Sequence, residues 1–144
     1  MDLTSSNSSF TLNVPDVFSA AQPLEGYATD DAFSTPEVEI AQVMKGVDGI
    51  MSGAFVPFIV TQIVTFQADS PSITETMEAW LAAMVAANAT YFGNGFIAIP
   101  SIGKQYELVN GLLTRVTPIP QAKKILQPVA YQIAWDKAIA SPLP

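Results

Sequence analysis

The sequence contains no cysteine and no histidine. Without cysteine there are no disulfides and no thiolate nucleophiles, and without histidine there is no imidazole base. The two absences together also remove the ligands of the usual zinc sites. Most classes of enzyme are therefore disfavoured at once, because each depends on at least one of these side chains.

Charged residues are scarce, at 13% of the chain, whereas a soluble monomer carries about 25%. So little charge favours a chain that buries part of its surface against other copies, although an apolar monomeric domain is the alternative. The net charge of −7 arises in residues 1–44, which hold seven acidic residues and no Lys or Arg. Clustered basic residues that could grip nucleic acid are missing, and an acidic surface would let DNA pass without binding.

Long apolar runs are also missing. The longest run, residues 55–60, is interrupted by Pro57 and is far shorter than the roughly 20 residues of a spanning helix. The first residues have neither the basic segment nor the apolar segment of a signal peptide. We therefore expect no membrane association.

The N-terminal half shows strand-like alternation between turn-rich stretches. Residues 1–9, rich in Ser and Asn, are predicted to be a mobile arm, followed by a single domain over residues 10–144. Alternation predicts strands at residues 10–14 and 37–44, and Gly and Asp predict a turn at residues 45–49. Residues 55–68 are predicted to form one long strand, in which Pro57 marks a bend or an edge.

A single helix is predicted over residues 72–88. Ser72 and Glu75 have the S-x-x-E spacing of a capping box. Six apolar residues then recur at helical spacing, namely Ile73, Met77, Trp80, Leu81, Met84 and Val85. The opposite face carries small residues that reflect either helix propensity or close packing against another subunit, namely Ala79, Ala82 and Ala83.

The C-terminal part returns to a β pattern. Strands are predicted at residues 96–100, 104–109, 112–117 and 125–136, with a short tail over residues 138–144. Asn110-Gly111 is the strongest hairpin signal of the chain. The predicted fold is mainly β with one helix (α+β), an antiparallel β-barrel or sandwich of about seven strands with the helix against one side.

A search for catalytic chemistry finds no convincing site. Ser101 and Lys104 have an S-x-x-K spacing, but they fall on a predicted turn and lack the companion motifs. Capping and solvation explain Glu75 and Glu78, and residues 30–31 lack the spacing of a calcium loop. The sequence therefore predicts no catalytic, cofactor-binding or metal site, and no cofactor.

The order of elements after residue 60 resembles the tail-tube proteins of tailed bacteriophages, including the tube-initiator proteins of contractile-tail baseplates. The resemblance covers slightly more than half of the chain. It is carried by five segments in order, Ser70-Pro71-Ser72, Glu78-Ala79-Trp80, Gly103-Lys104-Gln105-Tyr106-Glu107-Leu108, Asn110-Gly111-Leu112-Leu113-Thr114 and Leu126-Gln127-Pro128-Val129-Ala130-Tyr131-Gln132-Ile133-Ala134-Trp135.

The resemblance implies a structural virion protein without enzymatic activity, made in the bacterial host cytoplasm and located in the phage tail. Six copies would form a ring, and rings would stack, with DNA passing through the lumen without specific binding. Further partners would be tube, sheath or baseplate hub proteins, and residues 1–44 would contact a neighbouring subunit. The alternative function is a small-ligand-binding β-barrel, whose apolar interior would be lined by Val60, Val64 and Phe66.

The same resemblance assigns roles to particular residues. The strands of residues 37–66 would surround the lumen, with lumen-facing candidates Glu37, Glu39, Gln42, Thr61, Thr65 and Gln67. Contacts between subunits would involve two groups of small or apolar side chains, Phe10, Leu12 and Val14 near the N-terminus and Ala79, Ala82 and Ala83 on the helix.

Overall fold

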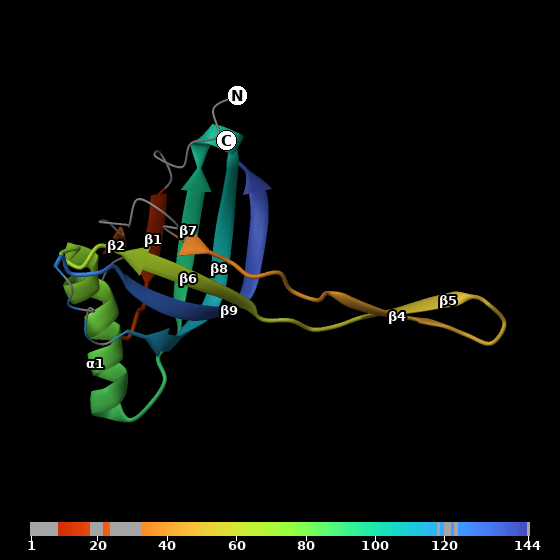
Figure 1. The fold of residues 1–144 in the computed structure, drawn as a ribbon, viewed down its shortest axis with the longest axis horizontal. Helices are drawn as coiled ribbons and strands as arrows, with labels where there is room; N and C mark the ends of the chain where they lie inside the picture. The colour runs from red at the N-terminus through yellow and green to blue at the C-terminus, as the bar shows by residue number, and fades with distance from the viewer. Residues whose placement is uncertain are drawn as a thin grey trace.

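The protein folds into an open antiparallel β-sheet with one helix and one long projecting hairpin (Figure 1). A computed structural model describes residues 9–17, 22–23, 33–117, 119, 122 and 124–143. Apart from Ser9, which begins the first strand, the predicted N-terminal arm lies outside the described residues, as do Asp30 and Asp31.

Seven strands form the large sheet. Their spatial order is β2 (Gln22–Pro23), β1 (Ser9–Asn13), β7 (Gly93–Ile99), β8 (Lys104–Val116), β9 (Val129–Pro142), β6 (Val60–Phe66) and β3 (Phe33–Ser34). All pairings are antiparallel, and β2 and β3 remain the two edges of the described sheet. The predicted mainly-β α+β class with one helix is confirmed, as a sandwich-like sheet that does not close into a barrel.

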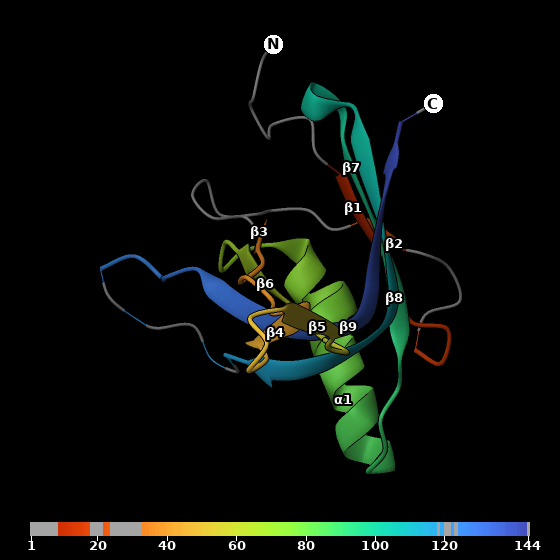
Figure 2. The same cartoon turned by 90° about the vertical axis from the view of Figure 1, so that its right-hand side faces the viewer.

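Two long strands divide this sheet into two halves. β8 pairs with β7 only as far as Gly111, whereas β9 pairs with β6 only as far as Trp135. The first half of β8 and the second half of β9 therefore belong with β7, β1 and β2, and the remaining halves belong with β6 and β3. Figure 2 shows β8 and β9 bending sharply between the halves, with the helix enclosed by the bend.

The helix α1 (Glu78–Ala87) continues from a π-helical turn, Ile73–Met77. The predicted capping box does not form, because the Ser72 side chain makes no cap hydrogen bond. Instead, Ser70 Oγ accepts a hydrogen bond from the Ser72 backbone N–H at 3.3 Å, and the Thr76 hydroxyl donates to the Ser72 carbonyl. The predicted end is confirmed, since Asn88 closes the helix in the left-handed conformation (φ 50°).

The core lies between the two half-sheets and the helix. Alternate residues of β1, β6, β7 and the first half of β9 face it, as period-two packing requires. The two buried indoles each donate a hydrogen bond, Trp80 to the Tyr91 carbonyl at 2.8 Å and Trp135 to Gln62 Oε1 at 3.0 Å. The buried apolar residues are Phe10, Leu12, Val14, Val64, Phe66, Ile73, Met77, Trp80, Ile97, Leu108, Leu113, Val129, Tyr131, Ile133 and Trp135.

The hairpin predicted at Asn110-Gly111 is wrong, because β8 runs straight through this dipeptide. Asn110 adopts φ 50° at a β-bulge, and its backbone N–H donates to Asn94 Oδ1 at 3.1 Å. A Cβ at Gly111 would lie 2.3 Å from the Trp135 ring. Left-handed backbone and close packing, the two properties that favour Asn-Gly in hairpins, serve here to bend a strand over an indole.

Two strand boundaries also differ from the prediction. The expected tail after residue 138 continues β9, with Pro142 opposite Lys104. The expected long strand over residues 55–68 is two strands, because β5 ends at Phe55 and β6 begins at Val60 with Pro57 between them. Proline lacks the N–H that a continuous ladder needs, so the chain leaves the sheet there.

Candidate assembly interface

The projecting hairpin consists of β4 (Ala41–Lys45) and β5 (Met51–Phe55), joined by a tight turn. In the turn the Gly46 carbonyl accepts the Gly49 N–H at 2.9 Å, and Asp48 Oδ1 accepts the Ile50 N–H at 3.0 Å. Gly49 has φ 81°, a conformation that favours glycine. The turn predicted at residues 45–49 is therefore confirmed, and it makes the tip of a hairpin that leaves the body of the molecule (Figure 1).

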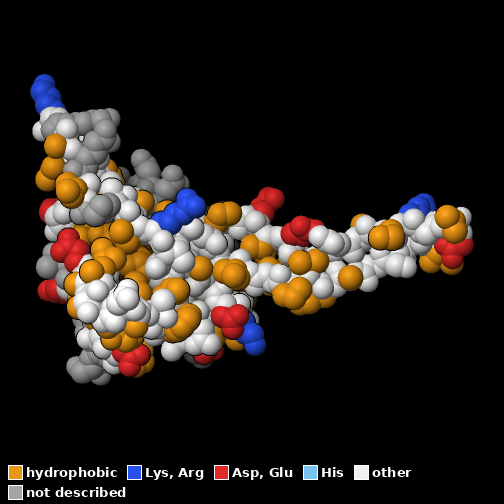
Figure 3. Space-filling view, turned by 90° about the horizontal axis from the view of Figure 1, so that it is seen from below, with side chains coloured by type: hydrophobic (Ala, Val, Ile, Leu, Met, Phe, Trp, Pro, Cys, Tyr) orange, Lys and Arg blue, Asp and Glu red, His pale blue; other side chains and the backbone are white. Residues whose placement is uncertain are grey.

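Large apolar side chains are exposed along this hairpin, most of them on the face that carries Val43, Met51 and Phe55. Every residue of β4 and β5 is exposed, and Figure 3 shows apolar side chains along its length with charges at the tip and near the base. A two-stranded hairpin is marginally stable alone in water, and contiguous exposed apolar surface marks interaction sites. The hairpin is therefore a candidate contact surface for another protein molecule. Its large apolar residues, 64–112% exposed, are Val43, Met44, Val47, Ile50, Met51 and Phe55.

The base of the hairpin is held by one backbone hydrogen bond and one ring contact beyond the paired strands. The Val56 N–H donates to the Ile40 carbonyl at 2.9 Å, and the rings of Phe55 and Phe58 meet edge to face at 6.1 Å. These contacts continue the two-stranded pairing down to the point where the chain enters β6.

Both long strands leave part of one edge unpaired among the described residues. Beyond Trp135, β9 has no strand on the side that β6 occupies earlier, and beyond Gly111, β8 has no strand on the side of β7. Unpaired N–H and C=O groups along such an edge form a template for another strand. The two edges belong to different half-sheets, so one subunit offers two distinct joints.

The predicted lumen-facing residues do not share one surface. Thr61 and Thr65 lie half-buried on the face of β6 that points away from the helix, because Gln62, Val64 and Phe66 face the core. The others are exposed at separate places, Glu37 and Glu39 on the segment before β4, Gln42 on β4, and Gln67 just after β6.

The predicted inter-subunit residues separate into two groups. Phe10, Leu12 and Val14 are at most 1% exposed, so their side chains build the core of their own chain and offer no surface to a neighbour. On the helix, by contrast, Ala82 is exposed while Ala79 and Ala83 are half-buried. Val85, expected in the core-facing stripe, is exposed as well.

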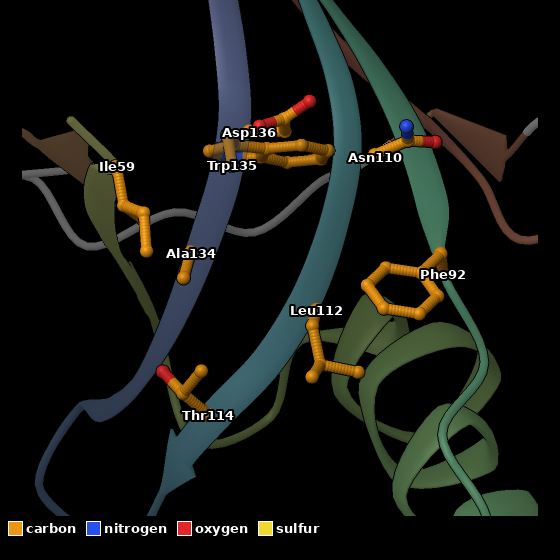
Figure 4. Close-up of a pocket in the computed structure, with 8 residues that line it drawn as sticks. All are labelled: Ile59, Phe92, Asn110, Leu112, Thr114, Ala134, Trp135 and Asp136. Atoms are coloured by element: carbon orange, nitrogen blue, oxygen red, sulfur yellow. The ribbon is translucent and has the colours of Figure 1, made fainter. Parts of the chain in front are cut away.

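A groove of about 560 Å³ crosses the bend on the face opposite the helix. Figure 4 shows Leu112 and Ala134 on neighbouring strands, with Ile59 beyond β9 and Phe92 beyond β8. Asn110 and Asp136 close one end (Figure 4). The lining holds a single carboxylate and no base beside the Thr114 hydroxyl, so the groove suits packing better than catalysis.

The barrel interior expected for a small-ligand-binding protein does not form. The sheet is open, and Val64 and Phe66 are fully buried in the packed core. Val60 alone of the three expected lining residues reaches a cavity, between the two half-sheets. These observations do not favour the ligand-binding alternative.

The remaining chemistry of the described residues is sparse. Within the described part of the chain, no three metal-ligating side chains come together. In the same part, no helix is long and apolar enough to cross a membrane. One pKa is displaced, because burial and, to a smaller extent, the negative charge of Glu78 raise the pKa of Tyr131.

Comparison with known proteins identifies the family. The family model described as tail fiber protein gp32 matches residues 1–139. The chain belongs to the tail fiber protein gp32 family. It is a structural protein of the phage tail, located in the virion tail. No curated protein matches the chain.

Two solved structures share the fold of this gp32-family chain. One is the baseplate of the anti-feeding prophage, 6-fold symmetrised, at 8% identity and a TM-score of 0.61, with 99% of this chain and 97% of that chain covered. The other is the tube-terminating cap of the anti-feeding prophage, at 8% identity and a TM-score of 0.65, with 99% and 93% covered. The two likenesses concern the fold, whereas the predicted membership of a phage tail protein family is confirmed by the family model.

Sequence reasoning missed the projecting hairpin and the two free edges. The hairpin had a visible signal, because the apolar pairs Val43-Met44 and Ile50-Met51 lie close to a turn of Gly and Asp. The free edges had none, since they depend on where β7 and β6 stop pairing with longer partners.

Proposed function

We propose that the protein is a ring-forming subunit of the phage tail tube or of its baseplate-proximal initiator, with six copies enclosing a lumen for DNA ejection. The observation that carries the proposal is the exposed hairpin on a body in which two strand edges have no partner strand among the described residues. A projecting element and an edge are different surfaces, so a contact between them is head-to-tail, which gives a ring when the rotation between neighbours closes.

The sixfold number rests on the shared fold. The similar prophage baseplate was symmetrised sixfold, and the same fold in the tube-terminating cap belongs to another part of that particle. A gp32-family subunit in a stacked ring would meet neighbours both within its ring and along the tube axis. The hairpin, which projects farthest from the body (Figure 1), is the element best placed for such contacts.

For the lumen we propose the face of β6 that carries Thr61 and Thr65. Its neighbours across the ladder, Ala134 opposite Thr61 and Ala130 opposite Thr65, are also uncharged. Small neutral side chains would let DNA slide past, because they offer no cation for phosphate. The acidic residues Glu37 and Glu39 and the amides of Gln42 and Gln67 would line the approaches.

Light scattering coupled to size exclusion, followed by negative-stain microscopy of the purified full chain, tests this function. We expect sixfold rings at micromolar concentration, and gel-shift measurements should show no DNA binding at physiological salt. A chain that stays monomeric up to millimolar concentration, with no rings on the grid, would contradict the proposal. Thr61→Lys serves as the lumen variant and should cause DNA retention without preventing ring formation.

A further inference from the structure

A cavity of about 320 Å³ lies between the two half-sheets. Its walls come from four strands of both halves, with Val60 and Gln62 on β6, Ile97 on β7, Tyr106 and Leu108 on β8, and Ala138 on β9. Its described lining contains no charged residue. The lining is mostly apolar, with Thr35, Gln62 and Tyr106 as its polar members, and it shares only Trp135 with the outer groove of Figure 4.

One end of a buried amide in this cavity makes no hydrogen bond among the described residues. Gln62 is 3% exposed, and its Oε1 accepts the Trp135 indole N–H at 3.0 Å. Because the indole can only donate, this bond fixes which end of the amide is oxygen. Among the described residues the Gln62 Nε2–H groups make no hydrogen bond, although the hydroxyl-bearing side chains of Thr35 and Tyr106 line the same cavity. A buried donor without an acceptor is unfavourable. A bound group with an oxygen atom that accepts this hydrogen bond would remove the penalty.

We propose that this cavity receives the hairpin tip of a second copy of the chain. Val47 and Ile50 would fill the apolar walls, and a backbone carbonyl of the turn would accept the hydrogen bond from Gln62 Nε2. The proposal rests on ring formation and specifies which surfaces join.

The hairpin tip carries both an exposed apolar side chain and a backbone carbonyl that can accept a hydrogen bond. Val47 is the most exposed large apolar residue described, at 112%. The Gly46 and Ile50 carbonyls are used within the turn, whereas the Val47 carbonyl has no backbone donor among the described residues. The charged residues Lys45 and Asp48 flank Val47 and would stay at the mouth, where water can reach them.

The contact has to be intermolecular. In Figure 1 the hairpin points away from the body, so its tip does not approach its own cavity. Tip and cavity are different surfaces, so each copy uses its tip on one neighbour and its cavity on the other. The same geometry would link every copy of a closed ring.

Engineered cysteines test this contact without background, because the chain has none of its own. We expect the double variant Val47→Cys with Ala138→Cys to give, on mild oxidation of assembled protein, a ladder of disulfide-linked species up to the full ring. The single variants should give dimers at most. The control double variant Val47→Cys with Glu75→Cys places the second thiol on the exposed start of the helical segment, and should cross-link at least tenfold more slowly.

The proposed hydrogen bond from Gln62 Nε2 to the hairpin tip is tested by the variant Gln62→Glu. The matched control is Gln132→Glu, on the opposite face of the sheet. Glutamate keeps an acceptor for Trp135 but replaces the donor with a charge that repels a carbonyl. We expect cross-linking of the Val47→Cys, Ala138→Cys protein to slow about tenfold with Gln62→Glu and little with Gln132→Glu.

The outcomes separate the two proposals. Rings that form normally while the ladder appears no faster than in the control would overturn the seating of the tip and leave the ring function standing. A chain that forms no rings at all would overturn the ring function, and the seating with it. Equal slowing by Gln62→Glu and Gln132→Glu would exclude the hydrogen bond.

Discussion

The body and the hairpin of this protein differ in the burial of their apolar residues. In the body, β6 and the first half of β9 alternate strictly, with one face in the core and the other partly exposed. In the hairpin, both faces of β4 and β5 are exposed although many of their residues are apolar. The body is stabilised by its own chain, whereas the hairpin exposes surface that only another molecule can cover. One sequence therefore contains a self-sufficient fold and an element that depends on a partner.

Truncating a phenylalanine in each region gives the largest expected difference. Phe10 is 1% exposed, and Phe10→Ala should lower the free energy of unfolding by about 4 kcal/mol through loss of burial and a cavity. The same change at exposed Phe55 should cost at most about 0.5 kcal/mol in the monomer. Urea unfolding of dilute protein, followed by tryptophan fluorescence, measures both. Similar losses for the two variants would mean that the hairpin packs on the body in solution.

Adding a methyl group to a glycine sharpens the same contrast. In Gly111→Ala the new Cβ would meet the Trp135 ring at 2.3 Å, and overpacking should cost about 2 kcal/mol. In Gly53→Ala, within the hairpin, the nearest atom is Val43 Cγ1 at 3.7 Å, an ordinary contact. Thermal unfolding should therefore separate the variants clearly. An unchanged melting temperature for Gly111→Ala would contradict the close packing of indole on backbone.

A charge on the hairpin should act on assembly and leave folding intact. Met51→Asp should leave the free energy of unfolding within about 0.5 kcal/mol of the parent. Ring formation should weaken about tenfold, equivalent to about 1.4 kcal/mol, because a desolvated apolar contact is replaced by a charge. Analytical ultracentrifugation over a concentration series measures the shift, with Glu75→Gln as the control. Unaltered assembly would show that the hairpin lies outside the interface.

The smallest expected effect is at alkaline pH. Burial, with a smaller contribution from Glu78, raises the pKa of Tyr131 in the folded protein above its usual value near 10. The folded state then holds this proton more tightly than the unfolded state, so this group's contribution is complete below pH 10 and is lost as pH rises further. The loss is at most about 1.4 kcal/mol per pH unit. Unfolding measured between pH 8 and 11 should show a shallower fall for Tyr131→Phe, and parallel curves would contradict the shift.

Several features were readable because they depend on neighbouring residues alone. The helical spacing of Ile73, Met77 and Trp80 predicted a helix that the structure confirms, and the alternation from Val60 predicted the faces of β6. The turn at residues 45–49 followed from the conformational freedom of glycine and the side chain of Asp48. Local patterns report local structure, and they succeeded where no distant contact intervened.

Where the structure differs from the prediction of the local sequence pattern, contacts with residues far along the chain account for the difference. Asn110-Gly111 became a bulge within β8 because Trp135 needs the space above Gly111. Phe10, Leu12 and Val14 entered the core because β1 pairs with β7, more than eighty residues along the chain.

The sequence by itself determined the absence of cysteine and histidine chemistry, the single helix, the mainly-β class and the resemblance to phage tail proteins. Only the tertiary structure decided that the sheet stays open, that β8 and β9 each leave half an edge unpaired, and that the apolar residues around the 45–49 turn project into solvent. The physical reason is that an edge or an exposed face is defined by what fails to pack against it, and packing between distant segments is not written in any local pattern.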